Sequence, residues 1–222
     1  MNHTLIIRKR LEKVKRIIAV AGAKGGVGKS SVSAVLSLIL SKQGKKTGLL
    51  DLDFTCPSSH ILLGAKDIFP KEELGLIPPK ASGVKFMSLV FFSKEQPLAL
   101  RGDSQTKALS ELLAVTLWGE LDYLIIDTPP GMSNILLDLA RYIKNIEFLI
   151  VSTGSPLSVS VSGALANILK EMKIPIVSRI ENMGKDVSYD AEFEKAIGNP
   201  EKLLFSKFAK DLEKIAERLE KS

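Results

Sequence analysis

The stretch IIAVAGAKGGVGKSSVSAVLSLIL (residues 17–40) contains the features that decide the fold. It opens with an apolar run of the length of a buried strand, continues with a glycine-rich segment and ends as a helical sequence. Glycines let a chain curl tightly around an anion, because no Cβ obstructs the converging backbone N–H groups. The positive end of the helix dipole favours the same anion. Strand, glycine loop and helix in this order predict a phosphate-binding loop.

Single residues of this loop have distinct expected roles. The glycines expected to shape it are Gly25, Gly26 and Gly28. Lys29 is expected to neutralise the β and γ phosphates of a nucleotide, and Ser30 to offer its hydroxyl to Mg²⁺. The usual pattern G-x4-G-K-[ST] has its first glycine where this chain has Ala23. This change narrows the φ range of the loop but removes no phosphate ligand.

The rest of the chain repeats the alternation of strand and helix. Apolar runs of strand length occupy residues 17–21, 48–52, 84–90, 123–126, 148–151 and 175–180. Helical stretches lie between them, at residues 30–43, 105–118, 135–142 and 158–172. Near-continuous apolar strands alternating with helices are typical of an α/β fold whose mostly parallel sheet is covered on both faces. We therefore predict a doubly wound α/β domain spanning residues 1–222.

The segments outside this alternation are interpreted as loops and ends. Residues 67–82 and 184–200 show no period and are expected to be loops. Residues 205–222 place apolar side chains at spacings of three or four, which predicts a C-terminal amphipathic helix. Its polar face mixes both charge signs, so we expect it to dock against the sheet and not on a membrane. Residues 1–14 are interpreted as a basic N-terminal extension.

The net charge of +6 is concentrated near the N-terminus, where residues 1–50 hold eleven Lys or Arg and one acid. Lys29 is assigned to the nucleotide, and Lys24 lies in the same loop. Of the other basic residues, six lie within the first sixteen positions: Arg8, Lys9, Arg10, Lys13, Lys15 and Arg16. A solvated helix or a surface for an acidic partner accounts for these charges, and nucleic acid is not an expected partner.

Composition also bears on the cellular location. No apolar run reaches the roughly 18 residues of a membrane-spanning helix, so no membrane span is expected. Residues 1–16 lack the pattern of a secretory signal, and Cys56 is the single cysteine. These features favour a reducing, cytoplasmic location.

Acidic residues stand directly after two of the predicted strands. Asp51 and Asp53 end the second strand, and Asp127 ends the run at residues 123–126. Ligands bind at the carboxyl ends of strands in such sheets, so these residues are expected to face the phosphate loop. Phosphoryl transfer needs a metal ion and an oriented water. Asp127 is assigned to bind Mg²⁺ together with Ser30, and Asp53 is assigned to orient the attacking water. Asp51 is a candidate either for the metal site or for a supporting contact to it.

Several motifs together resemble one known group. The loop KGGVGK (residues 24–29) resembles the deviant Walker A motif of the MinD, ParA and Mrp superfamily of P-loop ATPases. Within this superfamily, further stretches of the chain are similar to the Mrp/ApbC proteins, which are ATPases of iron-sulfur cluster assembly. These stretches are DLDFTCPSSHILLG (51–64), GVKFMS (83–88), the pair Arg101 and Gly102, WGELDYLIIDTPPG (118–131) and ENM (181–183). The resemblance covers about residues 15–184.

The resemblance implies a three-layer P-loop NTPase fold and an ATP- and Mg²⁺-dependent homodimer with slow ATP hydrolysis. Lys24 would reach across the dimer to the partner's phosphates, Ser31 would contact the α phosphate and Asn182 the adenine. Gly131 would direct a backbone N–H near the γ phosphate. The nucleotide-binding set is then Gly25, Gly26, Val27, Gly28, Lys29, Ser30, Ser31, Gly131 and Asn182, with Lys24, Lys29 and Asp53 as the catalytic residues.

The chain departs from this group at the cluster ligands. Relatives that carry an iron-sulfur cluster have a C-x-x-C pair soon after ENM, whereas residues 183–188 here are MGKDVS. Cys56 replaces a small glycine and is expected to be a small packing residue. Met132 and Asn134 also differ from the common pattern in the second switch segment.

These departures lead to an adaptor hypothesis, in which the ATPase serves a client apoprotein or a metallocofactor-assembly protein without binding the cluster itself. A positioning or partition ATPase similar to MinD or ParA is the alternative. A third reading is a regulatory nucleotide-binding module with negligible turnover.

Overall fold

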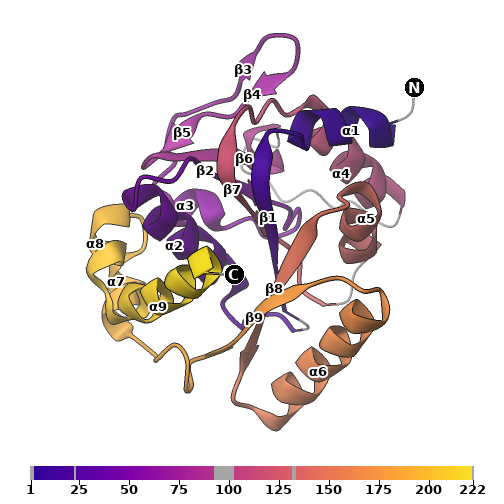
Figure 1. Ribbon diagram of the computed structural model, residues 1–222. Coiled ribbons are helices and arrows are strands. Elements are labelled where there is room, and N and C mark those ends of the chain that lie inside the picture. The colour runs from indigo at the N-terminus through magenta and orange to yellow at the C-terminus, as the bar shows by residue number, and fades with distance from the viewer. Residues whose placement is uncertain (1–2, 23, 93–102, 132–133, 222) are drawn as a thin grey trace.

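A seven-stranded sheet runs through the protein, which the computed structural model describes over residues 3–22, 24–92, 103–131 and 134–221 (Figure 1). Its strand order is β5-β6-β2-β7-β1-β8-β9, and all neighbours are parallel except β5 and β6. The strands are β1 (Val14–Ala21), β2 (Thr47–Asp51), β5 (Lys80–Ala81), β6 (Val84–Ser88), β7 (Leu121–Asp127), β8 (Ile146–Thr153) and β9 (Ile176–Asn182). The predicted mostly parallel α/β fold is confirmed, and each predicted apolar run forms a strand.

Helices cover both faces of this sheet. One face carries α2 (Lys29–Lys42), α3 (Ser59–Leu62), α7 (Ala191–Ala196), α8 (Pro200–Phe205) and α9 (Lys207–Lys221). The other face carries α1 (His3–Leu11), α4 (Asp103–Val115), α5 (Asn134–Tyr142) and α6 (Pro156–Glu171). Alternate residues of the central strand β1 serve the two cores: Ile18 packs with the first group and Ile17 with the second. This alternation follows from the period of two in a strand.

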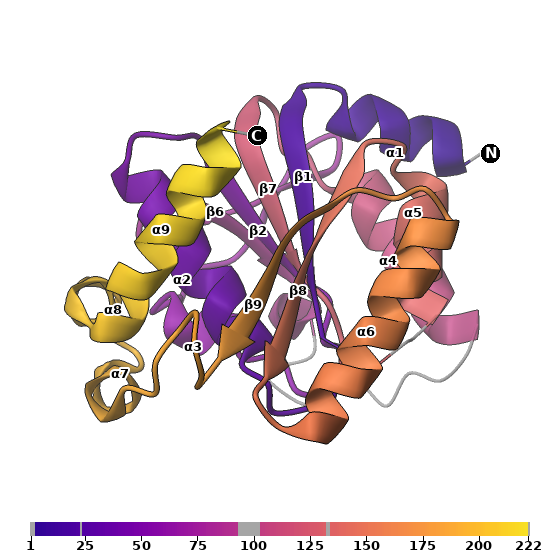
Figure 2. The same cartoon turned by 60° about the horizontal axis from the view of Figure 1, so that its bottom comes forward.

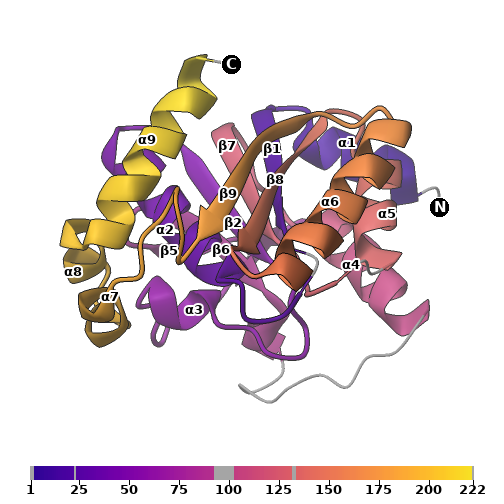
Figure 3. The ribbon, with the colours of Figure 1, turned by 90° about the horizontal axis from the view of Figure 1, so that it is seen from below.

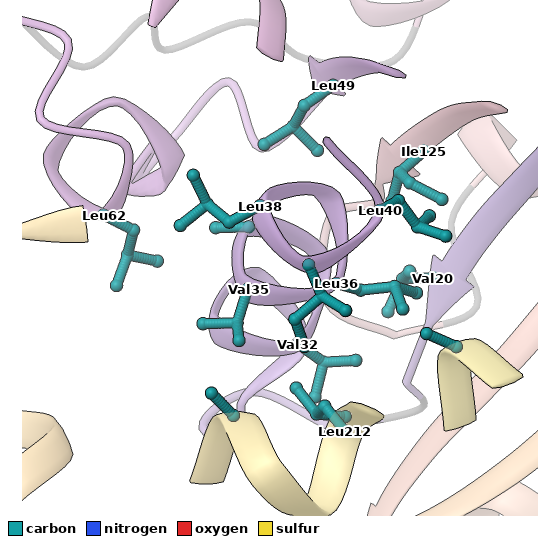
Figure 4. Close-up of a cluster of buried hydrophobic side chains, with 14 of the residues drawn as sticks. Val20, Val32, Val35, Leu36, Leu38, Leu40, Leu49, Leu62, Ile125 and Leu212 are labelled. Atoms are coloured by element: carbon teal, nitrogen blue, oxygen red, sulfur yellow. The ribbon is translucent and has the colours of Figure 1, made fainter. Parts of the chain in front are cut away.

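Helix α2 lies at the centre of the first core. All nine residues from 32 to 40 are buried, because the sheet lies on one side of the helix and α9 on the other. Figure 4 shows Val32, Val35 and Leu36 of this helix surrounded by side chains from the strands and from α9. A helix with apolar residues on every side is stable only in such an enclosed position. The phosphate loop is therefore connected to the most deeply buried helix of the fold.

The predicted C-terminal helix is present as α9, and its apolar stripe is buried. Its largest contacts are with α2 and α8, and Arg16 of β1 donates a hydrogen bond to the Leu219 carbonyl. Phe205, which was included in this stripe, ends α8 and is 73% exposed. The chain turns between the two helices, and this change of direction breaks the period.

Two segments predicted as loops contain regular structure, so that interpretation was wrong. Residues 67–82 hold the hairpin of β3 (Lys71–Glu72) and β4 (Leu76–Ile77) as well as β5. Residues 184–200 hold α7, whose first turn is capped by the Asp190 carboxylate. Strands of two residues and a helix of six are too short for a periodic signal in the sequence. Residues 89–92, predicted in part as strand, form a 3₁₀ turn.

The basic N-terminal segment is part of the folded structure. Residues 3–11 form α1, which lies beside α4 and buries Ile7 and Leu11. Arg10 donates hydrogen bonds to the carbonyls of Ala114 and Leu74. Part of the predicted solvated charge is thus committed to intramolecular contacts. Among the described residues, no helix combines the length and the apolar character needed to cross a membrane.

Gly48 and Gly163 provide a matched pair of tests for the packing of the sheet. A Cβ added at Gly48 in β2 would lie 2.8 Å from Leu121 Cδ1 and 2.9 Å from Trp118 Cζ3. We expect Gly48→Ala to lower the free energy of unfolding by about 1–3 kcal/mol, because the core must shift. Gly163 lies inside α6 with open space around it, so Gly163→Ala should raise it by about 0.5–1 kcal/mol. Urea unfolding measures both; equal effects would contradict the packing described.

Candidate functional site

The phosphate loop joins the carboxyl end of β1 to the first turn of α2. Gly26 and Gly28 have φ values of 77° and 87°, a backbone conformation that residues with a side chain rarely adopt. A Cβ at Gly28 would collide with Asn182 Nδ2, and one at Gly22 would lie 2.9 Å from the Val151 carbonyl oxygen. These glycines are required by backbone conformation and by close neighbours. The loop thus has the curled form that the sequence predicts.

Asn182, at the end of β9, holds the loop in place. Its Nδ2 donates to the Val27 carbonyl at 2.9 Å, and its Oδ1 accepts from the Met183 N–H at 2.9 Å. The side chain is 4% exposed. The residue expected to contact adenine therefore also ties the last parallel strand to the phosphate loop.

Two carboxylates lie side by side at the carboxyl ends of β2 and β7. Asp51 and Asp127 are register partners, with 1% and 0% exposure. Ser59 bridges them: its backbone N–H donates to Asp51 Oδ2 and its hydroxyl to Asp127 Oδ2, both at 3.2 Å. Burial and the neighbouring Asp127 raise the pKa of Asp51 well above its usual range.

Helix α2 supplies further partners to Asp127. The Ser33 hydroxyl lies 3.2 Å from Asp127 Oδ1 and 2.9 Å from the Lys29 carbonyl oxygen, so its single hydrogen is shared between these two acceptors. Burial raises the pKa of Asp127 to about 6, although a hydrogen bond with the Ser30 side chain and the Lys29 charge oppose the shift. Burial also lowers the pKa of Lys29, against the attraction of Asp127 and Asp53. One ammonium and two carboxylates thus form a single buried group.

Asp53 occupies the rim of this group. Its Oδ1 accepts from the Thr55 N–H at 3.2 Å, the Thr55 hydroxyl at 2.8 Å and the Cys56 N–H at 3.1 Å. The carboxylate is held by its own turn, and its charge acts on Lys29 and Asp51. Cys56 itself is exposed, so the expectation that it is a packing residue was wrong. It projects from the same turn that Asp53 stabilises.

The remaining predicted residues lie around the loop. Lys24 and Gly25 are exposed, and Ser31 is half-buried. The Gly131 N–H donates to the Gly22 carbonyl at 3.1 Å, which joins the segment after β7 to the start of the loop. Ala23, Arg101, Gly102 and Met132 lie outside the described residues.

A cavity of about 220 Å³ opens beside the loop. Its lining includes Gly26, Gly28 and Ser31 from the loop and, among others, Tyr189, Phe193 and Phe208. The aromatic residues were missed in the sequence, because Tyr189 and Phe193 lie in the segment read as a plain loop. Ser33 and Ser59 were missed as well. A phosphate loop beside an aromatic-lined cavity fits a nucleotide, with the base in the cavity.

The oxygen donors suit a magnesium ion bound together with phosphates. No group of three or more His, Cys, Asp or Glu side chains that would hold a metal occurs within the described part of the chain. Ser30 and Asp127 are hydrogen-bonded to each other beside Lys29. A hydroxyl and a carboxylate are hard ligands of the kind Mg²⁺ prefers, and Mg²⁺ commonly completes its shell with phosphate oxygens and water. The residues present therefore fit this ion as a companion of a nucleotide.

Comparison with known proteins identifies similar sequences. Residues 13–212 match a family model described as ParA, NUBPL iron-transfer P-loop NTPase. The chain is 37% identical over 81% of its length to an iron-sulfur cluster carrier protein of Aquifex aeolicus, of which it covers 50%. It is 40% identical over 78% of its length to the cytosolic Fe-S cluster assembly factor Nubp2 homolog 2 of Drosophila yakuba, of which it covers 70%. The chain spans about half to two thirds of the bacterial and archaeal relatives that it matches.

Solved structures share the fold. A nucleotide-binding protein from Archaeoglobus fulgidus in complex with ADP has a TM-score of 0.70 and 36% identity, covering 81% of this chain and 71% of the other. The septum site-determining protein MinD from Pyrococcus horikoshii, complexed with Mg-ADP, has a TM-score of 0.70 at 20% identity, covering 92% and 95%. The second likeness concerns the fold alone.

The raised pKa of Asp127 predicts a pH dependence of stability. The folded state holds a proton that the unfolded state has released, so this stabilisation is present below the ordinary carboxyl pKa and is lost as pH rises through about 6. A shift of this size corresponds to about 3 kcal/mol. We expect the nucleotide-free protein to lose stability between pH 4 and pH 7, and Asp127→Asn to lose less, because only the buried Asp51 of the pair then remains to titrate.

Urea unfolding of both proteins across this pH range measures the difference. Asp67→Asn, at an exposed position, is the matched control and should follow the wild type. A constant difference between Asp127→Asn and the wild type at every pH would contradict the raised pKa.

Proposed function

The chain belongs to the family of NUBPL iron-transfer P-loop NTPases, and from this premise we propose that it is a switch protein that binds Mg-ATP, hydrolyses it slowly and dimerises around the nucleotide. The observation that carries the proposal is the buried group of Lys29, Asp51 and Asp127 directly beneath a curled glycine loop. Buried charges of this kind have no evident structural benefit, because their desolvation is unfavourable. They are useful where phosphates and a cation are bound.

The chain's own residues provide the steps of hydrolysis. The N–H groups from Gly25 to Ser31 and the Lys29 ammonium bind the phosphates, and the base lies in the adjoining cavity near Tyr189. Mg²⁺, when bound at Ser30 and Asp127, supplies positive charge to the phosphate oxygens. The hydrogen bonds from Ser33 and Ser59 hold the Asp127 carboxylate in a fixed orientation.

Asp53 is assigned to the attacking water. Three hydrogen bonds to its Oδ1 orient the carboxylate. Its Oδ2 accepts a hydrogen bond from the water, which attacks the γ phosphorus to give ADP and phosphate. Gly131 reports the presence of the γ phosphate: its N–H, which bonds to the Gly22 carbonyl, lies close enough to the loop to exchange that partner for a phosphate oxygen.

We further propose that this ATPase is a cytoplasmic adaptor in iron-sulfur or metallocofactor assembly. Relatives named as an iron-sulfur cluster carrier protein and as an Fe-S cluster assembly factor support the pathway. The segment after Asn182 holds Met183 and Ser188 but no cysteine, and the single Cys56 would give two thiolates per dimer. Because a four-iron cluster is commonly held by four thiolates, the client apoprotein and not this chain is expected to hold it.

The alternative of a membrane-positioning ATPase gains no support from α9. Its apolar residues, among them Leu212 and Ile215, are buried against the core. A surface helix that binds a bilayer must expose its apolar face.

Two variants separate the roles proposed for Asp53 and Lys24. Asp53→Asn should lower kcat about 10²–10⁴-fold with nearly unchanged ATP affinity, because it acts on the water and not on the nucleotide. Lys24→Ala should abolish both ATP-dependent dimerisation and turnover, because Lys24 is exposed and would act on the partner's phosphates. Phosphate release and sedimentation velocity with Mg-ATP measure both effects. Lys66→Ala is the control; wild-type turnover in Asp53→Asn, or an intact dimer in Lys24→Ala, would refute the corresponding role.

The adaptor role predicts the metal content of the protein. Anaerobic purification followed by iron and sulfide analysis, with and without ATP, should give far less than one cluster per dimer. The same preparation should dimerise with ATP. Stoichiometric cluster that is lost in Cys56→Ser would overturn the adaptor role while leaving the ATPase proposal intact.

A further inference from the structure

A second polar cavity lies at the end of the sheet opposite the phosphate loop. Its volume is about 370 Å³, and its walls include Lys46, Lys80, Lys85, Gly83 and Glu120. Lys46 directly precedes β2, and Glu120 directly precedes β7, so the cavity lies at the amino ends of the strands. In Figure 2 the arrowheads of β8 and β9 point toward the opposite end, where α3 and the start of α2 lie. Figure 3 shows that end from below.

The hairpin of β5 and β6 places two lysines opposite each other. A two-residue turn connects the strands, and both of its residues, Ser82 and Gly83, have positive φ. Such a turn fixes the register, and Lys80 is therefore the direct partner of Lys85. Like charges at directly opposite positions of an antiparallel pair are destabilising. The fold thus keeps two like charges opposite each other, although their repulsion lowers the stability of the hairpin.

A third lysine increases the excess of positive charge at the cavity. Lys46 borders the same cavity, and its ammonium forms a 2.9 Å ion pair with Glu120. Among the residues that the structure describes, no carboxylate lies within ion-pair distance of Lys80 or Lys85. Among the residues that line the cavity, three ammonium groups therefore share one carboxylate, and the nearby Asp122, which also attracts Lys46, is paired with Lys15.

Lys85 is held in position. It is half-buried, and its Nζ donates a 2.5 Å hydrogen bond to the Trp118 carbonyl. Burial, with added repulsion from Lys80 and Lys46, lowers the pKa of Lys85. An ammonium group fixed by a backbone carbonyl, with two more at the same cavity, has the arrangement of an anion site that lacks only its counter-charge.

We propose that this lysine cavity binds a small molecule carrying a phosphate group. A compact anion with more than one negative charge suits the excess of positive charge, and lysines bind phosphate oxygens as point charges. The volume is near the lower end for small-molecule sites, which favours a small ligand over a segment of another protein. The ligand class is inorganic phosphate or pyrophosphate, or an organic phosphate such as a sugar phosphate. The inference is independent of ATP hydrolysis at the phosphate loop.

Titration of ¹⁵N-labelled protein with pyrophosphate, and separately with ribose 5-phosphate, tests the proposal. We expect saturable shifts of the Gly83, Lys85 and Gly119 amides, which are distinct from any shifts of Gly26 and Gly28 at the phosphate loop. Tighter binding of ribose 5-phosphate would assign an organic ligand, and tighter binding of pyrophosphate an inorganic one. Absence of saturable shifts at the cavity with both ligands, or equal shifts with sodium chloride at matched ionic strength, would overturn the proposal.

Three lysine variants give the matched comparison. Lys80→Gln with Lys85→Gln should raise the Kd at the cavity about tenfold or more, because charge-assisted hydrogen bonds are lost, and should leave the phosphate-loop shifts unchanged. Lys107→Gln, at an exposed position on α4, should bind as the wild type. Lys80→Gln alone should melt at the same or a higher temperature without ligand, because it relieves repulsion. Unchanged affinity in the double variant, or a lower melting temperature in Lys80→Gln, would refute the site.

Discussion

Burial of two carboxylates beside one ammonium is the constraint on which the rest of the structure depends. Asp51, Asp127 and Lys29 have almost no solvent contact, and charges in such a position need partners from the protein. Those partners come from separate elements: Ser59 at the start of α3 and Ser33 within α2. The site therefore exists only when the β2–β7 register, the short helix α3 and the packing of α2 are all correct.

The same helix that fills the core also forms the site. Helix α2 is enclosed by the sheet and α9, and its buried hydroxyl residues are Ser33 and Ser37. Ser33 is directed at Asp127, whereas Ser37 satisfies the Ser33 carbonyl within the helix at 2.7 Å. Because Lys29 and Ser30 form the first turn of α2, a shift of this helix in the core displaces the phosphate ligands as well. Stability and site geometry are thus coupled through one element.

The sequence predicts the elements of the fold that have a strong local signal. The apolar runs and the glycine loop lie where the structure has them, since buried parallel strands and phosphate loops have characteristic local patterns. Ser33 could not be predicted, because its partner Asp127 is 94 positions away and a serine within a helix carries no mark of its direction. The aromatic wall at Tyr189 and Phe193 was missed for a related reason: α7 is six residues long and shows no period. Cys56 was predicted to be a packing residue because of its small size, but it is exposed on a turn that is held by Asp53.

The buried group also explains why a proton and a metal ion would compete at this site. With both carboxylates ionised, Lys29 neutralises only one of them, and the excess negative charge lies in a region of low polarity. A proton on the pair removes that excess, which is the physical meaning of the raised pKa values of Asp51 and Asp127. A divalent cation removes it as well, and brings a positive charge that the phosphates of a nucleotide require. Nucleotide without a cation would instead add negative charge beside the carboxylates. The arrangement therefore favours nucleotide and cation together over either alone, and favours it more as pH rises above about 6.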